Sequence, residues 1–205
     1  MRFAAGLFDA VMYPLEASGL AGVRRSLARR ARGELLEIGS GTGANLAALQ
    51  RHAGQLRGYI GSDPAPPGVL YERVRQFGSL RGIPAEVAAC PAENLPFPAE
   101  SFDTVLVTLV LCSVKSQLQA LSELRRVLRP GGRLLFLEHV RHPQPGKALL
   151  MDAINPVYTR ITRECNLNRD TLAALQAAGF QCDTLNRSRS GIFVWGSAAD
   201  ATCCP

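Results

Sequence analysis

The stretch of sequence that decides the fold reads Glu37-Ile38-Gly39-Ser40-Gly41-Thr42-Gly43-Ala44-Asn45. Its three glycines separate a short apolar run, residues 35–38, from a segment with helical apolar spacing, residues 44–51. Glycine lets a backbone turn tightly and approach a ligand closely, and a helix start behind it offers unpaired N–H groups. The pattern therefore predicts a strand, a ligand-binding loop and a helix, in that order.

The rest of the chain alternates strand-like and helix-like segments. Further strands are predicted at residues 59–62, 85–90, 104–111 and 133–138, and helices at 69–77, 116–128 and 168–178. Such alternation is typical of an α/β protein with a mostly parallel sheet and helices on both faces. Two last strand-like runs, residues 181–185 and 192–196, have no helix between them and predict an antiparallel hairpin at one edge of the sheet.

A carboxylate follows the second predicted strand. Open α/β sheets bind ligands beyond the carboxyl ends of their strands, so Asp63 is placed to accept hydrogen bonds from the two hydroxyls of a ribose. Glu37 selects among nucleosides, because its charge would repel a pyrophosphate and attract the ammonium and sulfonium of S-adenosylmethionine. An oxidoreductase that binds NAD would need the same glycines without Glu37. Such an oxidoreductase is the alternative from a different class of enzyme.

Several motifs together resemble the class I S-adenosylmethionine-dependent methyltransferases, in the type 11 branch that includes the ubiquinone-type and phospholipid methyltransferases. They are residues 36–43, Ser62-Asp63-Pro64, residues 92–97, Ser101-Phe102-Asp103 and residues 128–132. More narrowly, residues 108–115, Glu138-His139-Val140 and Cys165-Asn166-Leu167 resemble the membrane-associated thiol S-methyltransferases. The resemblance implies a Rossmann-like fold with a seven-stranded, mostly parallel sheet and an antiparallel edge hairpin.

The resemblance also implies which residues hold S-adenosylmethionine and its product S-adenosylhomocysteine. The methionine part would lie against Glu37 and the loop residues, namely Gly39, Ser40, Gly41, Thr42 and Gly43. Asp63 would bind the ribose, with Pro64 beside it, and Leu109 would lie against the cofactor from the fourth strand. Ala92 and Glu93 would line the adenine edge, although Pro91 stands where many relatives have an acid.

The acceptor is predicted from the residues beyond the fourth and fifth strands. Methyl transfer is an in-line displacement, so the protein mainly has to hold the nucleophile and exclude water. His139 is the candidate base, and Glu138 beside it would set its tautomer or bind substrate; a structural histidine is the equally weighted alternative. Residues 108–111 lack the polar clamp that nucleobase amines need, so no nucleic acid is expected as a partner.

A small, apolar thiol is therefore the favoured acceptor. A phospholipid amine and a quinone carbon are the alternatives within the methyltransferases. A non-catalytic protein that binds S-adenosylmethionine is a third interpretation.

Length and composition set the remaining expectations. At 205 residues we expect one domain, with a helical lid over residues 1–32, a cofactor-binding core over 33–140 and a substrate-side segment and hairpin over 141–205. Tyr13 and Asp9 would reach the methionine end of the cofactor from the lid. The formal charge of +6 is spread along the chain, as on an ordinary solvated surface, and no obligate protein partner is expected.

Compartment and metal content are predicted from what the sequence lacks. The start of the chain does not read as a secretory signal, which predicts a cytoplasmic protein. Residues 17–32 carry an apolar face and several arginines; a helix docked on the sheet is favoured, and weak contact with a membrane surface is the alternative. The cysteines show no paired spacing, so neither a metal site nor a disulfide framework is expected, and Cys203 and Cys204 read as an idle pair on a frayed tail.

Overall fold

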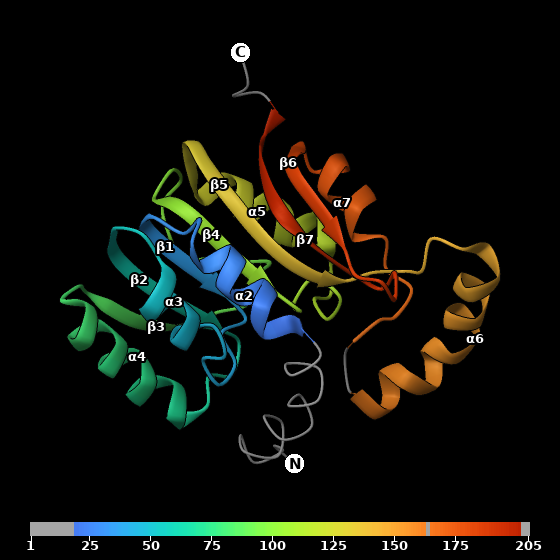
Figure 1. Ribbon diagram of the computed structural model, residues 1–205, viewed down its shortest axis with the longest axis horizontal. Coiled ribbons are helices and arrows are strands. Elements are labelled where there is room, and N and C mark those ends of the chain that lie inside the picture. The colour runs from blue at the N-terminus through green and yellow to red at the C-terminus, as the bar shows by residue number, and fades with distance from the viewer. Residues whose placement is uncertain (1–18, 163–164, 202–205) are drawn as a thin grey trace.

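The computed structural model describes residues 19–162 and 165–201, and a seven-stranded sheet forms its centre (Figure 1). The strands lie in the order β3-β2-β1-β4-β5-β7-β6. Their bounds are β1 Gly33–Ile38, β2 Leu56–Asp63, β3 Ala85–Ala89, β4 Phe102–Thr108, β5 Leu128–His139, β6 Phe180–Arg187 and β7 Phe193–Asp200. The predicted α/β class and the number of strands are confirmed.

The middle of the sheet is parallel and buried on both faces. β1 pairs in parallel with β2 on one side and with β4 on the other, and β4 pairs in parallel with β5. Leu36 and Val105, which face each other across β1 and β4, are both fully buried. Apolar runs without alternation suit such strands, because helices cover both of their faces.

The strand direction reverses at one edge of the sheet, as predicted. β7 runs antiparallel to both of its neighbours, β5 and β6, so the two last strands form a hairpin that closes this side. α7 ends before Gly179, whose φ of 85° turns the chain directly into β6. The short hairpin connection leaves no length for a helix, which is why these strands cannot be parallel.

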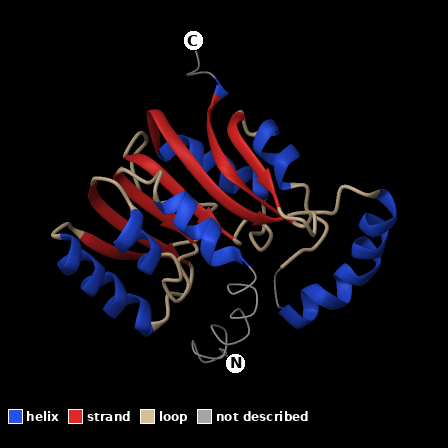
Figure 2. Cartoon of the chain, viewed as in Figure 1, coloured by secondary structure: helices blue, strands red, loops and turns tan. Residues whose placement is uncertain are grey.

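Helices cover the two faces of the sheet (Figure 2). One face packs against α2, α3 and α4, and the other packs against α5 and α7. The described helices are α2 Ala21–Ala28, α3 Leu46–His52, α4 Gly68–Arg81, α5 Gln117–Val127, α6 Pro145–Thr162 and α7 Thr171–Ala177. Among the described residues we find no helix with the length and apolar character needed to cross a membrane.

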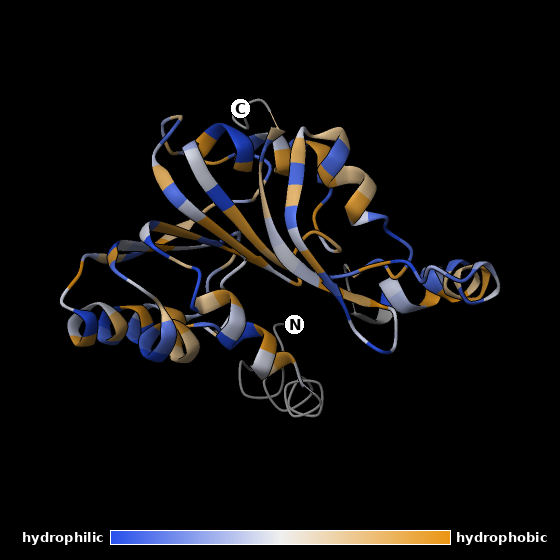
Figure 3. Ribbon diagram, turned by 45° about the horizontal axis from the view of Figure 1, so that its top comes forward, coloured by the Kyte–Doolittle hydropathy of each residue, from blue (hydrophilic) through white to orange (hydrophobic). Residues whose placement is uncertain are grey.

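The helix α6 was not predicted. It stands beyond the edge of the sheet (Figures 1 and 3) and leaves several large apolar side chains exposed, among them Leu149, Leu150 and Val157. Pro156 interrupts its sequence pattern. A helix that does not lie against the core needs no single apolar stripe, so periodicity gave no signal for it.

The strand β4 ends earlier than predicted. The run 104–111 is continuous in apolar residues, yet the strand stops at Thr108 because Leu109 adopts a φ of 59°. A leucine rarely takes this left-handed conformation, and apolar character alone does not reveal it. The turn at Leu109 directs the following residues toward the loop that comes after β1.

Candidate functional site

The glycine-rich loop lies where β1 ends, at the carboxyl edge of the parallel strands. Gly39, Gly41 and Gly43 all have positive φ, of 62°, 54° and 86°. Around Gly41 there is open space: a Cβ built there would find only the carbonyl oxygen of Gly39, 3.9 Å away. The loop therefore presents bare backbone toward any ligand at this edge of the sheet, as the sequence predicted.

Asp63 ends β2 beside this loop and is half-buried. One carboxylate oxygen accepts the N–H of Gly41 at 3.2 Å, and the other accepts the N–H of Ala65 at 2.8 Å. Pro64, which follows it, is exposed. The structure thus brings Asp63 and the glycine loop together, in the arrangement that a ribose next to the loop backbone requires.

Glu37 lies beneath the loop and not within it. Its carboxylate accepts a hydrogen bond from the Tyr59 hydroxyl at 2.6 Å and another from the Asn45 amide at 2.8 Å. Burial raises the pKa of this carboxyl, although both hydrogen bonds oppose the rise. Through these two hydrogen bonds Glu37 ties Asn45 of the loop segment to Tyr59 of β2, and its contact with the cofactor stays a prediction.

Arg24 joins this buried network from α2. Its guanidinium donates to Asn45 Oδ1 at 2.7 Å and to Thr108 Oγ1 at 3.1 Å, and Asn45 Nδ2 also donates to Thr108 Oγ1 at 2.9 Å. Arg24 was expected on the polar side of an amphipathic helix, yet it is buried. The helix docks on the sheet with Leu27 inward, which agrees with the favoured interpretation over the described part of residues 17–32.

Three residues of this network, Arg24, Asn45 and Thr108, were not proposed as site residues. Arg24 and Thr108 lie 84 positions apart, so no local pattern links them. Asn45 closes the quoted glycine stretch, and its amide in a loop of small residues was a signal that could have been used.

The residues after β4 lie against the glycine loop. A Cβ built on Gly39 would come within 2.3 Å of Val110 Cγ2. The backbone N–H of Leu109 donates to the Leu137 carbonyl at 2.7 Å, which holds the turn in place. Leu109 is therefore at the carboxyl edge, where the sequence placed it, with Val110 as an apolar neighbour that the sequence did not single out.

Ser40 and Thr42, the other residues of the loop, anchor the loop to neighbouring elements. Ser40 and Thr42 are buried, and the backbone N–H of Ser40 donates to the Ser62 carbonyl at 2.9 Å. The Thr42 carbonyl accepts the guanidinium of Arg73 at 2.6 Å. These bonds attach the loop to β2 and α4, so Ser40 and Thr42 contribute their backbone more than their side chains.

The proposed adenine edge is formed after β3. Ala92 is buried in the core, while Glu93 is half-buried and accepts the backbone N–H of Lys115 at 2.7 Å. Glu93 thereby connects this loop to the start of α5. Pro91 is exposed and has no N–H, so its place next to Ala92 supplies no backbone donor for an adenine.

Glu138 and His139 end β5 and lie on opposite faces of the sheet, because neighbouring residues of a strand alternate. Glu138 Oε1 accepts the N–H groups of Val110 and Leu111 at 3.0 and 3.1 Å. The ring of His139 packs edge-on against Phe193, with centroids 5.5 Å apart. Among the described residues, neither Glu138 Oε2 nor His139 Nδ1 has a hydrogen-bond partner, so Glu138 does not set the tautomer of His139.

Burial shifts the pKa of each of these side chains toward its uncharged form. It raises the pKa of Glu138 well above its ordinary value, and it lowers the pKa of His139 to about 4. His139 is thus a neutral imidazole near the carboxyl edge. Tyr13 and Asp9, together with Cys203 and Cys204, lie outside the described residues, and so does most of the expected lid.

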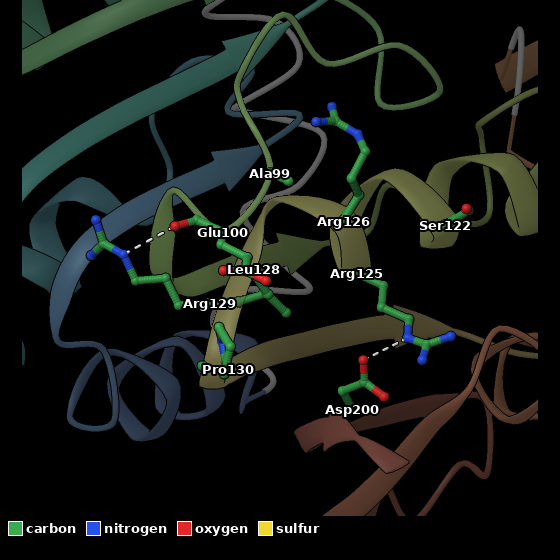
Figure 4. A pocket seen from close by; sticks show the side chains of 10 residues that line it. Ala99, Glu100, Ser122, Arg125, Arg126, Leu128, Arg129, Pro130 and Asp200 are labelled. Atoms are coloured by element: carbon green, nitrogen blue, oxygen red, sulfur yellow. Dashed lines mark hydrogen bonds and ion pairs between the residues drawn. The ribbon is translucent and has the colours of Figure 1, made fainter. Parts of the chain in front are cut away.

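A separate pocket opens at the opposite edge of the sheet (Figure 4). It lies where β5 begins, at Leu128, and arginines line it. Arg125 pairs with Asp200 at 2.6 Å, and Arg129 pairs with Asp103 at 2.8 Å. These cations have carboxylate partners and lie far from the glycine loop, so we do not assign the pocket to the site.

Comparison with known proteins decides the family. Residues 36–136 match the model of a family described as a methyltransferase domain. Over these residues the chain is a member of the methyltransferase family. The matched segment begins in β1 and ends in β5, so it contains the glycine loop, Asp63 and the turn at Leu109.

Two kinds of curated methyltransferase are similar to this chain. Thiol S-methyltransferase TMT1B of Rattus norvegicus is 37% identical over 148 residues, which cover 71% of this chain and 59% of the relative. The ubiquinone/menaquinone biosynthesis C-methyltransferase UbiE of Bordetella avium (strain 197N) is 31% identical over 170 residues, covering 71% and 62%. The chain thus spans about 60% of the length of these relatives.

A solved structure shows the same fold. The geranyl diphosphate C-methyltransferase of Streptomyces coelicolor A3(2), in complex with Mg2+, geranyl-S-thiolodiphosphate and S-adenosyl-L-homocysteine, has a TM-score of 0.62 at 16% identity. The match covers 82% of this chain and 69% of that chain. The expected Rossmann-like methyltransferase fold is confirmed.

Proposed function

We propose that this methyltransferase moves the methyl group of S-adenosylmethionine to the thiol of a small, apolar molecule. S-adenosylmethionine is the cofactor of the family to which residues 36–136 belong. The observation that carries the proposal is the bare backbone at Gly41 next to the Asp63 carboxylate, at the carboxyl edge of a sheet of this family. The choice of a thiol rests on the 37% identity to a thiol S-methyltransferase.

The chain's own residues suit the cofactor in two places. Open space at Gly41 allows a ligand to approach the loop backbone, and Asp63 offers a half-buried carboxylate for ribose hydroxyls. When bound, S-adenosylmethionine supplies an electrophilic methyl group on a sulfonium. Leu109 and Val110, next to the loop, then exclude water from the side on which the acceptor enters.

The buried side chains at the end of β5 favour a soft nucleophile. A histidine with a pKa of about 4 is a weak base, and Glu138 is buried with its Oε1 already holding the N–H groups of Val110 and Leu111. A thiol with an ordinary pKa of about 8.5 is already partly ionised near neutral pH, so it needs little help from the protein. His139 is then an acceptor-side residue that contacts substrate and does not have to remove its proton.

A quinone carbon is the second candidate, because UbiE of Bordetella avium is 31% identical over 170 residues. Carbon methylation needs an activated ring. His139, with a pKa of about 4, is a weak base for that activation, and this favours the thiol.

A panel of acceptors separates the candidates. The protein is incubated with S-adenosylmethionine and, in separate reactions, small apolar thiols, glutathione, a demethylated quinone and phosphatidylethanolamine. Formation of S-adenosylhomocysteine and of the methylated product is followed by mass spectrometry. We expect turnover of the apolar thiols above that of glutathione, whose charges are costly to desolvate. Turnover of the quinone or the phospholipid, with none on any thiol, would overturn the choice of acceptor and leave the methyltransferase activity intact.

A further inference from the structure

Two cysteines that are far apart in the sequence meet on the acceptor side of the sheet. Cys112 lies in the turns after β4, and Cys165 lies in the segment before α7, 53 positions later. Their Sγ atoms are 3.6 Å apart. Cys112 is buried and Cys165 is half-buried, so one thiol of the pair can be reached from outside. The wide spacing of these cysteines had suggested only isolated thiols.

Polar contacts hold the two segments face to face. The backbone N–H and the side-chain amide of Asn166 both donate to the Cys112 carbonyl, at 2.9 and 3.1 Å. The guanidinium of Arg169 donates to the Leu111 carbonyl at 2.8 Å. Because these bonds join the residues after Cys165 to the backbone at Leu111 and Cys112, the thiols are kept as neighbours. A disulfide has an S–S distance of about 2.05 Å, and at 3.6 Å the two sulfur atoms are already in contact.

The two thiols differ in reactivity. A hydrogen bond with Cys112 lowers the pKa of Cys165, and Tyr158 and Arg169 act in the same direction against the effect of burial. The same contact with Cys165, together with burial, raises the pKa of Cys112. The thiolate is the attacking species in disulfide exchange, so the accessible Cys165 is the first nucleophile and Cys112 follows.

We infer that Cys165 and Cys112 form a reversible disulfide by exchange with small-molecule disulfides. Cys165 attacks one sulfur of the disulfide RSSR; the S–S bond breaks, and one RSH leaves with the proton of Cys165. Cys112 then attacks Cys165 Sγ in the mixed disulfide and expels the second RSH, which takes the proton of Cys112. The protein pair is oxidised by two electrons, RSSR is reduced to two RSH, and excess thiol reverses the reaction.

The bond would tie the segment before α7 to the turns that border the glycine loop. Val110 packs on Gly39, and Glu138 Oε1 holds the N–H groups of Val110 and Leu111 only one or two residues before Cys112. This inference goes beyond the proposed function, because the exchange requires neither S-adenosylmethionine nor a methyl acceptor.

Peptide mapping tests the inference on the full chain. The protein is treated with 2-hydroxyethyl disulfide, free thiols are blocked by alkylation, and a proteolytic digest is compared by mass spectrometry before and after reduction. We expect one peptide that links Cys112 to Cys165, with loss of two hydrogens and with recovery of both free thiols after reduction. Cys182 is exposed and serves as the internal control, since it should form only a mixed disulfide with the reagent.

Single variants define the order of the steps. In Cys112→Ser, Cys165 should stop at the mixed disulfide, and in Cys165→Ser, Cys112 should remain largely unmodified; circular dichroism confirms that each variant is folded. If Cys112 and Cys165 each carry the reagent separately, or are alkylated as readily after oxidation as before, the inference is wrong. The mapping of the unmodified chain decides this even where a variant fails to fold.

Discussion

Gly39 and Val110 touch so closely that a Cβ at position 39 would come within 2.3 Å of Val110 Cγ2. The loop after β1 and the turn after β4 are therefore one packed unit. Gly39→Ala would combine this clash with the strain of an L side chain at a φ of 62°. We expect it to lower the free energy of unfolding by about 2–4 kcal/mol, measured by urea denaturation.

Gly41→Ala is the matched control, because Gly41 shares the positive φ but has open space around it. Gly41→Ala should lower the free energy of unfolding only by the backbone strain of an L side chain at positive φ, about 1 kcal/mol. Its binding of S-adenosylhomocysteine should weaken, because the new methyl group enters the space of the ligand. Equal losses of stability in the two variants would show that the contact with Val110 does not matter.

The buried network at Arg24 gives a second expectation. Arg24→Met keeps much of the side-chain volume but removes the donors to Asn45 and Thr108, so we expect a loss of about 1–3 kcal/mol in unfolding free energy. Arg25→Met, at the exposed neighbouring position, should be nearly neutral. Chemical denaturation of both variants in parallel gives the comparison. A neutral Arg24→Met would mean that the arginine contributes no stability to the site.

The parts of the fold that local chemistry determines could be predicted from the sequence. The glycines at 39, 41 and 43 and the carboxylate at Asp63 mark a loop and a strand end by residue type alone. The direction of the edge hairpin follows from the short connection before β7. These features need no knowledge of distant residues.

Features created by tertiary packing were missed. Arg24 points into the protein because its guanidinium donates hydrogen bonds to Asn45 and Thr108. Glu37 is held inside the protein by a hydrogen bond from Tyr59 on the neighbouring strand. Leu109 belongs to an apolar run and gives no sign of its left-handed turn. Hydrogen-bond partners that lie far apart in the sequence cannot be predicted from local residue patterns.

The pH dependence of stability should reflect Glu138. Burial raises its pKa well above 4.5, so the folded chain binds more protons than the unfolded chain, and the free energy of unfolding falls as pH rises above 4.5. Glu138→Gln keeps an oxygen that can accept from Val110 and Leu111 but carries no charge. We expect a smaller fall with pH in this variant, measured by denaturation across a pH series.

Glu138→Ala separates charge from hydrogen bonding. It leaves the N–H groups of Val110 and Leu111 without their acceptor and should be destabilised by about 1–3 kcal/mol even at acidic pH. If Glu138→Gln and the parent chain lose stability equally as pH rises, burial does not raise the pKa of the Glu138 carboxyl, and this explanation of the pH dependence is wrong.

The ionisation of His139 should not affect the pH dependence of kcat/KM near neutral pH. With a pKa of about 4 it stays neutral from pH 5.5 upward, so kcat/KM for a thiol should rise with the ionisation of the thiol itself. His139→Gln should reduce kcat by less than about tenfold and keep the shape of the profile. A loss of about 10²–10⁴-fold, together with the disappearance of one limb of the profile, would instead identify His139 as a general base.

Calorimetric titration of the parent chain and of Asp63→Ala is the most direct test of the cofactor site. S-adenosylhomocysteine should bind the parent chain in the micromolar range and far more tightly than NAD does, and Asp63→Ala should lose about 1–3 kcal/mol of that binding while remaining folded. Tighter binding of NAD than of S-adenosylhomocysteine, or an Asp63→Ala variant that binds as tightly as the parent, would contradict the site built here from Gly41 and Asp63.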